Sequence, residues 1–319
     1  MSVLPCVGIG DIRIWPLLDG RMTVDEPPGF PAADDPEYAV HAEYIHDGKW
    51  HIDIGGFLVQ SGDRLVLVDA GTGPGDGEVF APNLDDSRAE LVHWAAANGM
   101  TDPEQVLTAL QSLARTDIRT GSLAANLGQI GFRPEDVTDV LLSHLHFDHI
   151  GWVSMDGKPF FPNAVIRCER HDAEHFLAPE HDDTFYRVMW NAMPTSERMA
   201  PILDRFEPWD EDALIVPGIE CCFGPGHTPG SSFFSITSGS EQALILGDAV
   251  HCPQELMDPD FNGTGGDFDP EQSEATRDRI RRDAADQQVL LSAPHFPRLQ
   301  FGRLHVGERA RRWHFRWQS

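Results

Sequence analysis

The sequence predicts a single α/β domain, because short apolar runs typical of buried strands alternate with amphipathic segments typical of helices along its 319 residues. No change of composition and no Pro-, Gly- or Ser-rich linker divides the chain. It contains no internal repeat and no low-complexity tract. Hydrophobic residues make up 41% of it, enough for a globular core at this length.

Apolar runs rich in β-branched and aromatic residues predict the strands of this domain. In chain order they cover residues 12–18, 52–60, 64–71, 139–144, 164–169, 220–224, 231–237, 242–248 and 289–295, and residues 308–317 are a candidate closing strand. Residues 27–36 and 72–85 are rich in Pro and Gly and are expected to form loops.

Helical periodicity and capping residues predict the helices. They cover residues 86–99, 101–115, 121–130, most of 171–205 with breaks near Pro179 and Pro194, and 270–286. The first helix is expected to stop at Gly99, and Thr101 with Glu104 forms a candidate capping box for the second. The helical regions around 73–130 and 170–205 are expected to decorate the domain rather than divide it.

The chain is strongly acidic, with 24 Lys plus Arg against 51 Asp plus Glu and a formal net charge of −27. This charge argues against nucleic-acid partners and against docking on anionic membranes. No apolar run approaches the roughly 18 residues of a membrane span, and the first residues show no basic segment followed by an apolar stretch. We expect a cytoplasmic protein without nucleic-acid or membrane partners.

The cysteines and the basic residues have unusual distributions. Five cysteines at irregular spacing are typical of a reducing compartment, and those after residue 100 are expected to be small core residues: Cys168, Cys221, Cys222 and Cys252. Lys49 and Lys158 are the only lysines, so nearly every positive charge is an Arg. We attribute this bias to genome composition, and a salt-adapted acidic surface is the alternative. Because Arg is the better bidentate partner of carboxylates, some arginines are candidates for ion pairs.

The strongest functional signal is the segment His144-Leu145-His146-Phe147-Asp148-His149, which holds four potential metal ligands in six residues directly after an apolar strand. Alternate residues of an extended chain share a face, so His144 and His146 can point to the same side. Imidazole and carboxylate groups suit Zn²⁺ and other first-row divalent metals. The segment therefore predicts a metal site.

Three further candidate ligands follow along the chain. His227 lies in a Gly-flanked turn, Gly226-His227-Thr228-Pro229-Gly230, between two predicted strands. Asp248 ends the run Leu246-Gly247-Asp248, and His295 ends the strand predicted at 289–295. Each is a weak signal alone, and together with the His-rich segment they strengthen the prediction.

These motifs, preceded by Asp69 in the segment LVDAG, resemble those of metallo-β-lactamase-fold hydrolases over about residues 52–300, with residues 1–51 as an N-terminal extension. The resemblance implies a four-layer αββα sandwich of two mixed sheets, here with helical insertions. It implies two divalent metal ions, zinc first and manganese, iron or cobalt as alternatives. It assigns His144, His146 and His227 to one metal, Asp148, His149 and His295 to the other, and Asp248 to both. Asp69 would support the ligand loop by hydrogen bonding.

The same resemblance implies the chemistry of a hydrolase. A water bridging two cations has its pKa lowered toward about 7, and the resulting hydroxide would attack an ester or lactone carbonyl. Asp148 would orient this nucleophile and pass a proton to the leaving group. His251 stands where related lactonases commonly carry a substrate-binding Tyr. It is either a hydrogen-bond donor to the substrate or a loop residue without that role.

Within the family, the ligand set with Asp248 resembles N-acyl homoserine lactone lactonases and methyl-parathion-hydrolase-like esterases. We expect a small ester or lactone substrate. A thioesterase or organophosphate hydrolase of the same fold remains an alternative, and so does a non-catalytic metal-binding scaffold.

Several further residues have two interpretations. Phe147 and Trp152 either line the substrate pocket or pack beside the ligand loop. Trp50, His51 and residues 27–36 are candidates for a lid or for an arm between two subunits of a homodimer. His171 and His175 have a spacing that can bind a metal on a helix, but are expected to face solvent.

Overall fold

The computed structural model describes residues 5–24, 45–46, 49–74, 84–97, 102, 117–258, 261, 266–285, 287–306 and 313–317. The helix predicted over 101–115 and the loop predicted over 27–36 lie outside the described residues, apart from Asp102. Residues 75–83 of the loop predicted over 72–85 and residues 308–312 of the closing strand predicted over 308–317 also lie outside them.

The first of two large sheets has eight strands. Its main path runs β1-β2-β4-β5-β7-β10, with β3 paired to β4 and β6 paired to β2. The pairs β5·β7 and β7·β10 are parallel and the others are antiparallel, so the sheet is mixed. Its strands are β1 (Val7–Ile9), β2 (Ile12–Val24), β3 (Ile45–His46), β4 (Lys49–Ser61), β5 (Arg64–Val68), β6 (Asp117–Arg119), β7 (Asp139–Leu141) and β10 (Val165–Arg167).

The second sheet has seven strands in the order of the chain, from β11 to β17. It is also mixed, because β14 and β15 pair in parallel while the other pairs are antiparallel. Its strands are β11 (Ala213–Val216), β12 (Ile219–Phe223), β13 (Ser232–Ser238), β14 (Glu241–Ile245), β15 (Val289–Ser292), β16 (Gly302–Val306) and β17 (Trp313–Trp317). A separate ribbon joins β8 (Ser154–Met155) and β9 (Lys158–Pro159).

The two sheets face each other across one apolar layer. Val66 and Val68 of β5 pack in this layer with residues of the second sheet such as Phe234 and Ile236. The intervening Leu65 and Leu67 of the same strand belong to a different cluster, on the outer face of the first sheet. This alternation is the period of two expected when both faces of a strand are buried.

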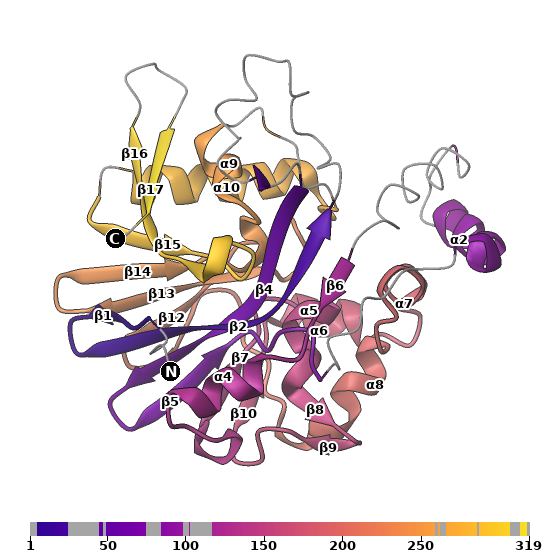
Figure 1. The fold of residues 1–319 in the computed structure, drawn as a ribbon, viewed down its shortest axis with the longest axis horizontal. Helices are drawn as coiled ribbons and strands as arrows, with labels where there is room; N and C mark the ends of the chain where they lie inside the picture. Colours follow the sequence, from indigo (N-terminus) through magenta and orange to yellow (C-terminus); the bar gives the residue numbers. More distant parts are fainter. Residues whose placement is uncertain are drawn as a thin grey trace.

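Helices cover both outer faces of the sandwich (Figure 1). Leu123 and Leu127 of α4 pack on the first sheet, and Ile280 and Ala284 of α10 pack on the second. The predicted αββα sandwich is therefore confirmed. The helices are α2 (Leu84–Ala97), α4 (Leu123–Gln129), α5 (Phe147–Ile150), α6 (Arg170–Phe176), α7 (Thr184–Trp190), α8 (Thr195–Met199), α9 (Pro253–Met257) and α10 (Pro270–Ala284). The 3-10 helices are η2 (Pro134–Asp136), η3 (Gly151–Val153), η4 (Ala200–Arg205), η5 (Gly247–Ala249) and η6 (Pro297–Leu299).

Helix α2 lies beside α7 at the edge of the molecule (Figure 1). The two helices share a small apolar cluster of their own, with Leu91 from α2 and Val188 and Met189 from α7. Trp94 of α2 stacks on Phe185 of α7, with ring centroids 4.9 Å apart. The two predicted helical insertions therefore pack on each other as well as on the sandwich.

Most predicted elements are confirmed within the described residues, and two differences stand out. The strand predicted over 289–295 ends at Ser292, so His295 lies in the following loop. The short strands β1, β3, β6, β8, β9, β11 and β16 were not predicted, because they are stabilised mainly by pairing with neighbouring strands rather than by a pattern of their own. Cys168, Cys221 and Cys252 are buried as predicted, whereas Cys222 is partly exposed.

Arginine side chains pair extensively with carboxylates, as one interpretation of the composition predicted. Asp139 is fully buried and binds the guanidinium groups of Arg64 and Arg167, the latter at 2.8 Å. Arg281 is also buried and its Nη1 lies 2.7 Å from Glu274. Among the residues that the structure describes, no helix is both long and apolar enough to cross a membrane.

Candidate metal centre

The seven residues predicted as metal ligands come together at one edge of the sandwich, each in a segment that follows a strand. The segment after β7 carries four of them, the turn between β12 and β13 carries His227, and the segments after β14 and β15 carry Asp248 and His295. Their potential ligand atoms form two groups, each within 4.8 Å: His144, His146, His227 and Asp248; and Asp148, His149 and His295.

In the first group, three imidazole nitrogens converge. Nδ1 of His146 lies 2.8 Å from Nε2 of His144 and 3.0 Å from Nε2 of His227. Burial, assisted by the neighbouring imidazoles, lowers the pKa of His144 and of His146 well below the usual value. This shift favours the neutral imidazole, which is the protonation state that binds metal ions.

In the second group, the carboxylate of Asp148 lies between two imidazoles. Its Oδ1 is 3.8 Å from Nε2 of His149, and its Oδ2 is 3.5 Å from Nε2 of His295. Burial opposes a charge on His149, but the carboxylates of Asp248, Asp69 and Asp148 raise its pKa well above the usual value. The arrangement thus attracts positive charge to this point.

The carboxylate of Asp248 connects the two groups. Its Oδ1 lies 3.3 Å from Nε2 of both His149 and His295, and its Oδ2 lies 3.5 Å from Nε2 of His227. Although burial acts in the opposite direction, the surrounding imidazoles, led by His149, hold the pKa of Asp248 well below the usual value. The carboxylate is therefore ionised and has one oxygen toward each group.

The centre also contains buried polar atoms that the protein does not satisfy. Among the described residues, Oδ1 of Asp248 and Nε2 of His149 have no hydrogen-bond partner. Unpaired buried polar atoms are costly, and a cation bound between them would satisfy both. Imidazole nitrogens with carboxylate oxygens are also the donor set preferred by zinc and related metals. The residues therefore fit a pair of divalent metal ions.

Asp69 makes the supporting hydrogen bonds that were expected of it. Its Oδ1 accepts from the backbone N–H of Ser143 at 2.7 Å, and its Oδ2 accepts from the Ser143 hydroxyl at 2.9 Å. The same Oδ2 lies 3.1 Å from Nδ1 of His149. The residue thus holds both the start of the ligand segment and the ring of one candidate ligand.

Three further partners of the imidazoles were missed from the sequence. Nδ1 of His227 lies 3.1 Å from the carboxylate of Asp267, and Nδ1 of His295 lies 2.8 Å from the backbone carbonyl of Asp53. The hydroxyl of Tyr186 lies 2.7 Å from Nε2 of His146. Such partners orient imidazole ligands and select their tautomer, but no sequence spacing connects them to the motifs.

Asp172 of α6 was missed as well, and it joins two ligand-bearing segments. Its Oδ2 accepts from the backbone N–H of Leu145 at 2.9 Å. Its Oδ1 accepts from the Thr228 hydroxyl at 2.7 Å and from the Gly230 N–H at 2.6 Å. The buried carboxylate therefore fixes the segment of His144 and His146 against the turn of His227.

His251 lies in the segment between η5 and α9, directly beside Asp248. Its Nε2 is 3.4 Å from Oδ2 of Asp248, and its Nδ1 is 3.3 Å from Oε1 of Glu255. Burial opposes a charge on this ring, but Glu255 and Asp248 raise the pKa of His251 well above the usual value. Each nitrogen of the His251 ring therefore faces a carboxylate.

The other sequence candidates have different surroundings. Trp152 is buried and donates from Nε1 to Asp19 at 2.9 Å, so it packs beneath the ligand loop. Phe147 lines a pocket next to the centre. His171 and His175 belong to neither ligand group, and the side chain of His171 is 56% exposed. Trp50 is buried in a cluster with Cys252.

Comparison with known proteins places this fold and site in a family. The family model described as the metallo-beta-lactamase superfamily matches residues 56–292. The match covers well over half of the chain and includes six of the seven candidate ligands. The chain therefore belongs to the metallo-beta-lactamase superfamily.

Curated relatives cover part of the chain. The N-acyl homoserine lactonase AiiA of Bacillus thuringiensis subsp. kurstaki is 28% identical over 171 residues, which are 53% of this chain and 60% of that protein. A probable metallo-hydrolase of Mycobacterium tuberculosis is 27% identical over 203 residues, 61% of this chain and 56% of that protein. The chain thus spans about 60% of the length of the lactonases it matches.

Solved structures resemble the whole chain. AidC, described as a dizinc quorum-quenching lactonase in complex with a product, has a TM-score of 0.74 and 22% identity over 100% of this chain and 98% of AidC. The hydrolase AbOPH has a TM-score of 0.74 and 23% identity over the same shares. At this identity the likeness establishes the fold.

Proposed function

We propose that this protein is a dinuclear metal-dependent hydrolase of small esters or lactones. The observation that carries the proposal is the buried carboxylate of Asp248, which has one oxygen toward the imidazoles of His149 and His295 and the other toward His227. A carboxylate in this position can bind two cations at once, and the surrounding residues supply three further ligands for each.

The proposed ligands are assigned by the atoms that converge. Nε2 of His144, Nδ1 of His146 and Nε2 of His227 would hold one metal ion. Asp148 with Nε2 of His149 and Nε2 of His295 would hold the other. Zinc ranks first because the donors are nitrogen and carboxylate oxygen, and manganese, iron and cobalt accept the same donors.

When bound, a pair of divalent ions would lower the pKa of a bridging water toward neutrality and polarise the carbonyl of a substrate. The residues around them would supply the remaining functions. We assign to Asp148 the orientation of the attacking water and the transfer of its proton to the leaving group. We assign to His251 a hydrogen bond to the substrate, because Glu255 and Asp248 hold its ring at the edge of the centre.

The names of the relatives support an ester or lactone substrate. The curated lactonases and the dizinc lactonase AidC are described as acting on N-acyl homoserine lactones or binding their product. The surface charge supports a substrate that is not a polyanion, because a chain with a formal charge of −27 repels one.

The proposal is tested by metal analysis followed by a substrate panel. The purified protein is expected to hold about two transition-metal ions per chain and to lose hydrolysis after chelation, with recovery on adding Zn²⁺, Co²⁺ or Mn²⁺. The panel comprises homoserine lactones, γ- and δ-lactones, aryl esters, thioesters, organophosphates and nitrocefin. Preference for thioesters or organophosphates would replace the proposed substrate class. If the protein holds two metal ions but hydrolyses no compound of the panel, the result would favour a non-catalytic metal-binding scaffold. A metal content of one ion per chain or none would contradict the dinuclear centre.

A further inference from the structure

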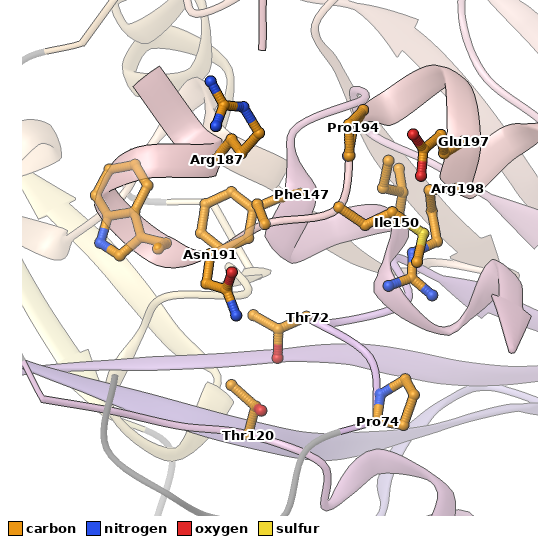
Figure 2. Close-up of a pocket in the computed structure, with 13 residues that line it drawn as sticks. Thr72, Pro74, Thr120, Phe147, Ile150, Arg187, Asn191, Pro194, Glu197 and Arg198 are labelled. Atoms are coloured by element: carbon orange, nitrogen blue, oxygen red, sulfur yellow. The ribbon is translucent and has the colours of Figure 1, made fainter. Parts of the chain in front are cut away.

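A pocket of about 520 Å³ borders the candidate metal centre. Phe147 and Ile150 form part of its wall, and in the same short helix they flank Asp148 and His149. The opposite wall includes Thr72 and Thr120, as Figure 2 shows. Its volume lies within the range of small-molecule sites. Under the proposed function, on which this inference rests, the pocket would receive the part of the substrate that is remote from the hydrolysed bond.

Aromatic side chains make one side of this pocket apolar. Phe147 stacks on Trp190, with ring centroids 5.2 Å apart and an interplanar angle of 15°. Both residues line the pocket, together with Ile150 and Met193. This side can therefore bury the methylene groups of an acyl chain.

A cation without a carboxylate partner lies on another side of the same pocket. Nη1 of Arg198 donates to the backbone carbonyl of Ser154 at 2.7 Å, and within the described part of the chain its guanidinium has no ion pair. In Figure 2 the guanidinium of Arg198 points away from the carboxylate of Glu197. Glu197 is the acidic residue among the described residues that line this pocket. Burial lowers the pKa of Arg198, and no carboxylate offsets this.

The second arginine of the pocket differs in this respect. Arg187 forms an ion pair with Glu90 of α2, and in Figure 2 its guanidinium points away from the ring of Phe147. Because no carboxylate of the described residues pairs with the partly buried Arg198, its remaining N–H groups are available to a ligand. Guanidinium groups bind carboxylates in a bidentate geometry.

We propose that Arg198 makes this pocket selective for acyl chains that end in a carboxylate, so that the substrates include monoesters or lactone-linked derivatives of medium-chain dicarboxylic acids. The apolar wall of Phe147, Ile150 and Trp190 would hold the methylene groups, and Arg198 would bind the terminal carboxylate. Thr72, Thr120 and Asn191 would add hydrogen bonds at the polar side of the pocket.

The test compares two esters of equal length on the metal-loaded protein: 4-nitrophenyl hexanoate and the mono-4-nitrophenyl ester of adipic acid. We expect a higher kcat/KM for the adipate ester, and an Arg198→Gln variant should lower kcat/KM for that ester by about 10- to 100-fold while changing the hexanoate value little. Arg198→Lys keeps the charge and should retain part of the preference. The control Arg133→Gln removes an exposed arginine that pairs with Asp136 and should leave the ratio unchanged.

Two results would overturn the inference. One is the absence of any preference for the adipate ester. The other is a preference that survives in a folded Arg198→Gln variant, because the carboxylate would then bind elsewhere, for example at the metals. Calorimetric titration with the mono-butylamide of adipic acid and with N-butylhexanamide measures the same selectivity without hydrolysis. A failure of the proposed function is therefore distinguished from a failure of the pocket assignment.

Discussion

The hydroxyl oxygen of Tyr186 lies 2.7 Å from Nε2 of His146, while Nδ1 of the same ring faces Nε2 of both His144 and His227. A metal on Nδ1 requires the proton of this imidazole to be on Nε2, where it donates to the Tyr186 oxygen. Tyr186 belongs to α7, which packs against α2. The helical region around 170–205 therefore contacts a candidate ligand directly through Tyr186, in addition to the backbone contacts of Asp172.

We predict that Tyr186→Phe weakens the first metal site by about 10- to 100-fold, because it removes the partner that orients His146 but keeps the aromatic ring. Competition between the protein and a chelator for Co²⁺ measures this affinity directly. Trp94→Leu is the matched control, since it disturbs the packing of α2 on α7 without touching the hydroxyl. Equal affinities in wild type and Tyr186→Phe would show that the contact does not position the ligand.

Replacing Asp248 by Ala is expected to reduce the metal content to about one ion per chain or less and to lower kcat/KM by at least about 100-fold. The physical reason is that both groups lose a ligand at once. The control is Asp204→Ala, which removes an exposed carboxylate beside Arg205 and should retain full metal content. A fully loaded and active Asp248→Ala protein would refute the bridging assignment.

His251→Phe is expected to lower kcat by about 100-fold with unchanged metal content, because a hydrogen-bond donor is lost but no proposed ligand is. His251→Tyr supplies a different donor at the same position and should recover part of the activity. Steady-state kinetics with metal analysis of each variant makes the measurement. If the His251→Phe variant has the same kcat as the wild type, His251 has no catalytic role.

The buried carboxylate of Asp139 is expected to make the stability of the folded protein depend on pH. Although burial acts in the opposite direction, Arg64, Thr138 and Arg167 hold the pKa of Asp139 below its usual value. A carboxylate with a lowered folded-state pKa stabilises the fold above its unfolded-state pKa of about 4 and loses this contribution as the pH falls further. We predict that Asp139→Asn costs about 2 kcal/mol at pH 7, a value reduced by the solvent exposure of Arg64.

Urea unfolding of wild type and Asp139→Asn at pH 7 and at pH 3 measures this difference, which should shrink at the lower pH. Asp136→Asn is the control, because Asp136 pairs with Arg133 at the surface and its loss should change stability little. A gap between the two proteins that is equal at both pH values would contradict the assignment of stability to the ionised carboxylate.

The fold class and the candidate ligands were predictable from local sequence patterns. His144, His146, Asp148 and His149 were visible because four ligand types fall within six residues after an apolar strand. His227, Asp248 and His295 were visible because each follows or ends an apolar run and because their order resembles a known family. The continuous apolar run over 64–71 similarly predicted a buried strand, and β5 packs Leu65 and Val66 into different clusters on its two faces.

The residues that support these ligands, and the pocket beside them, could not be predicted from local patterns. Tyr186, Asp172, Asp267 and Asp53 belong to segments far from the ligand motifs in sequence, and each reaches the centre because helices and strands pack there. The position of the Arg198 guanidinium in the pocket, where no described carboxylate pairs with it, likewise depends on its surroundings rather than on its neighbours in the chain. The spacing of apolar residues predicts helices and strands, and a cluster of His and Asp in one loop predicts metal ligands. Contacts between distant segments depend instead on how the two sheets and their helices pack.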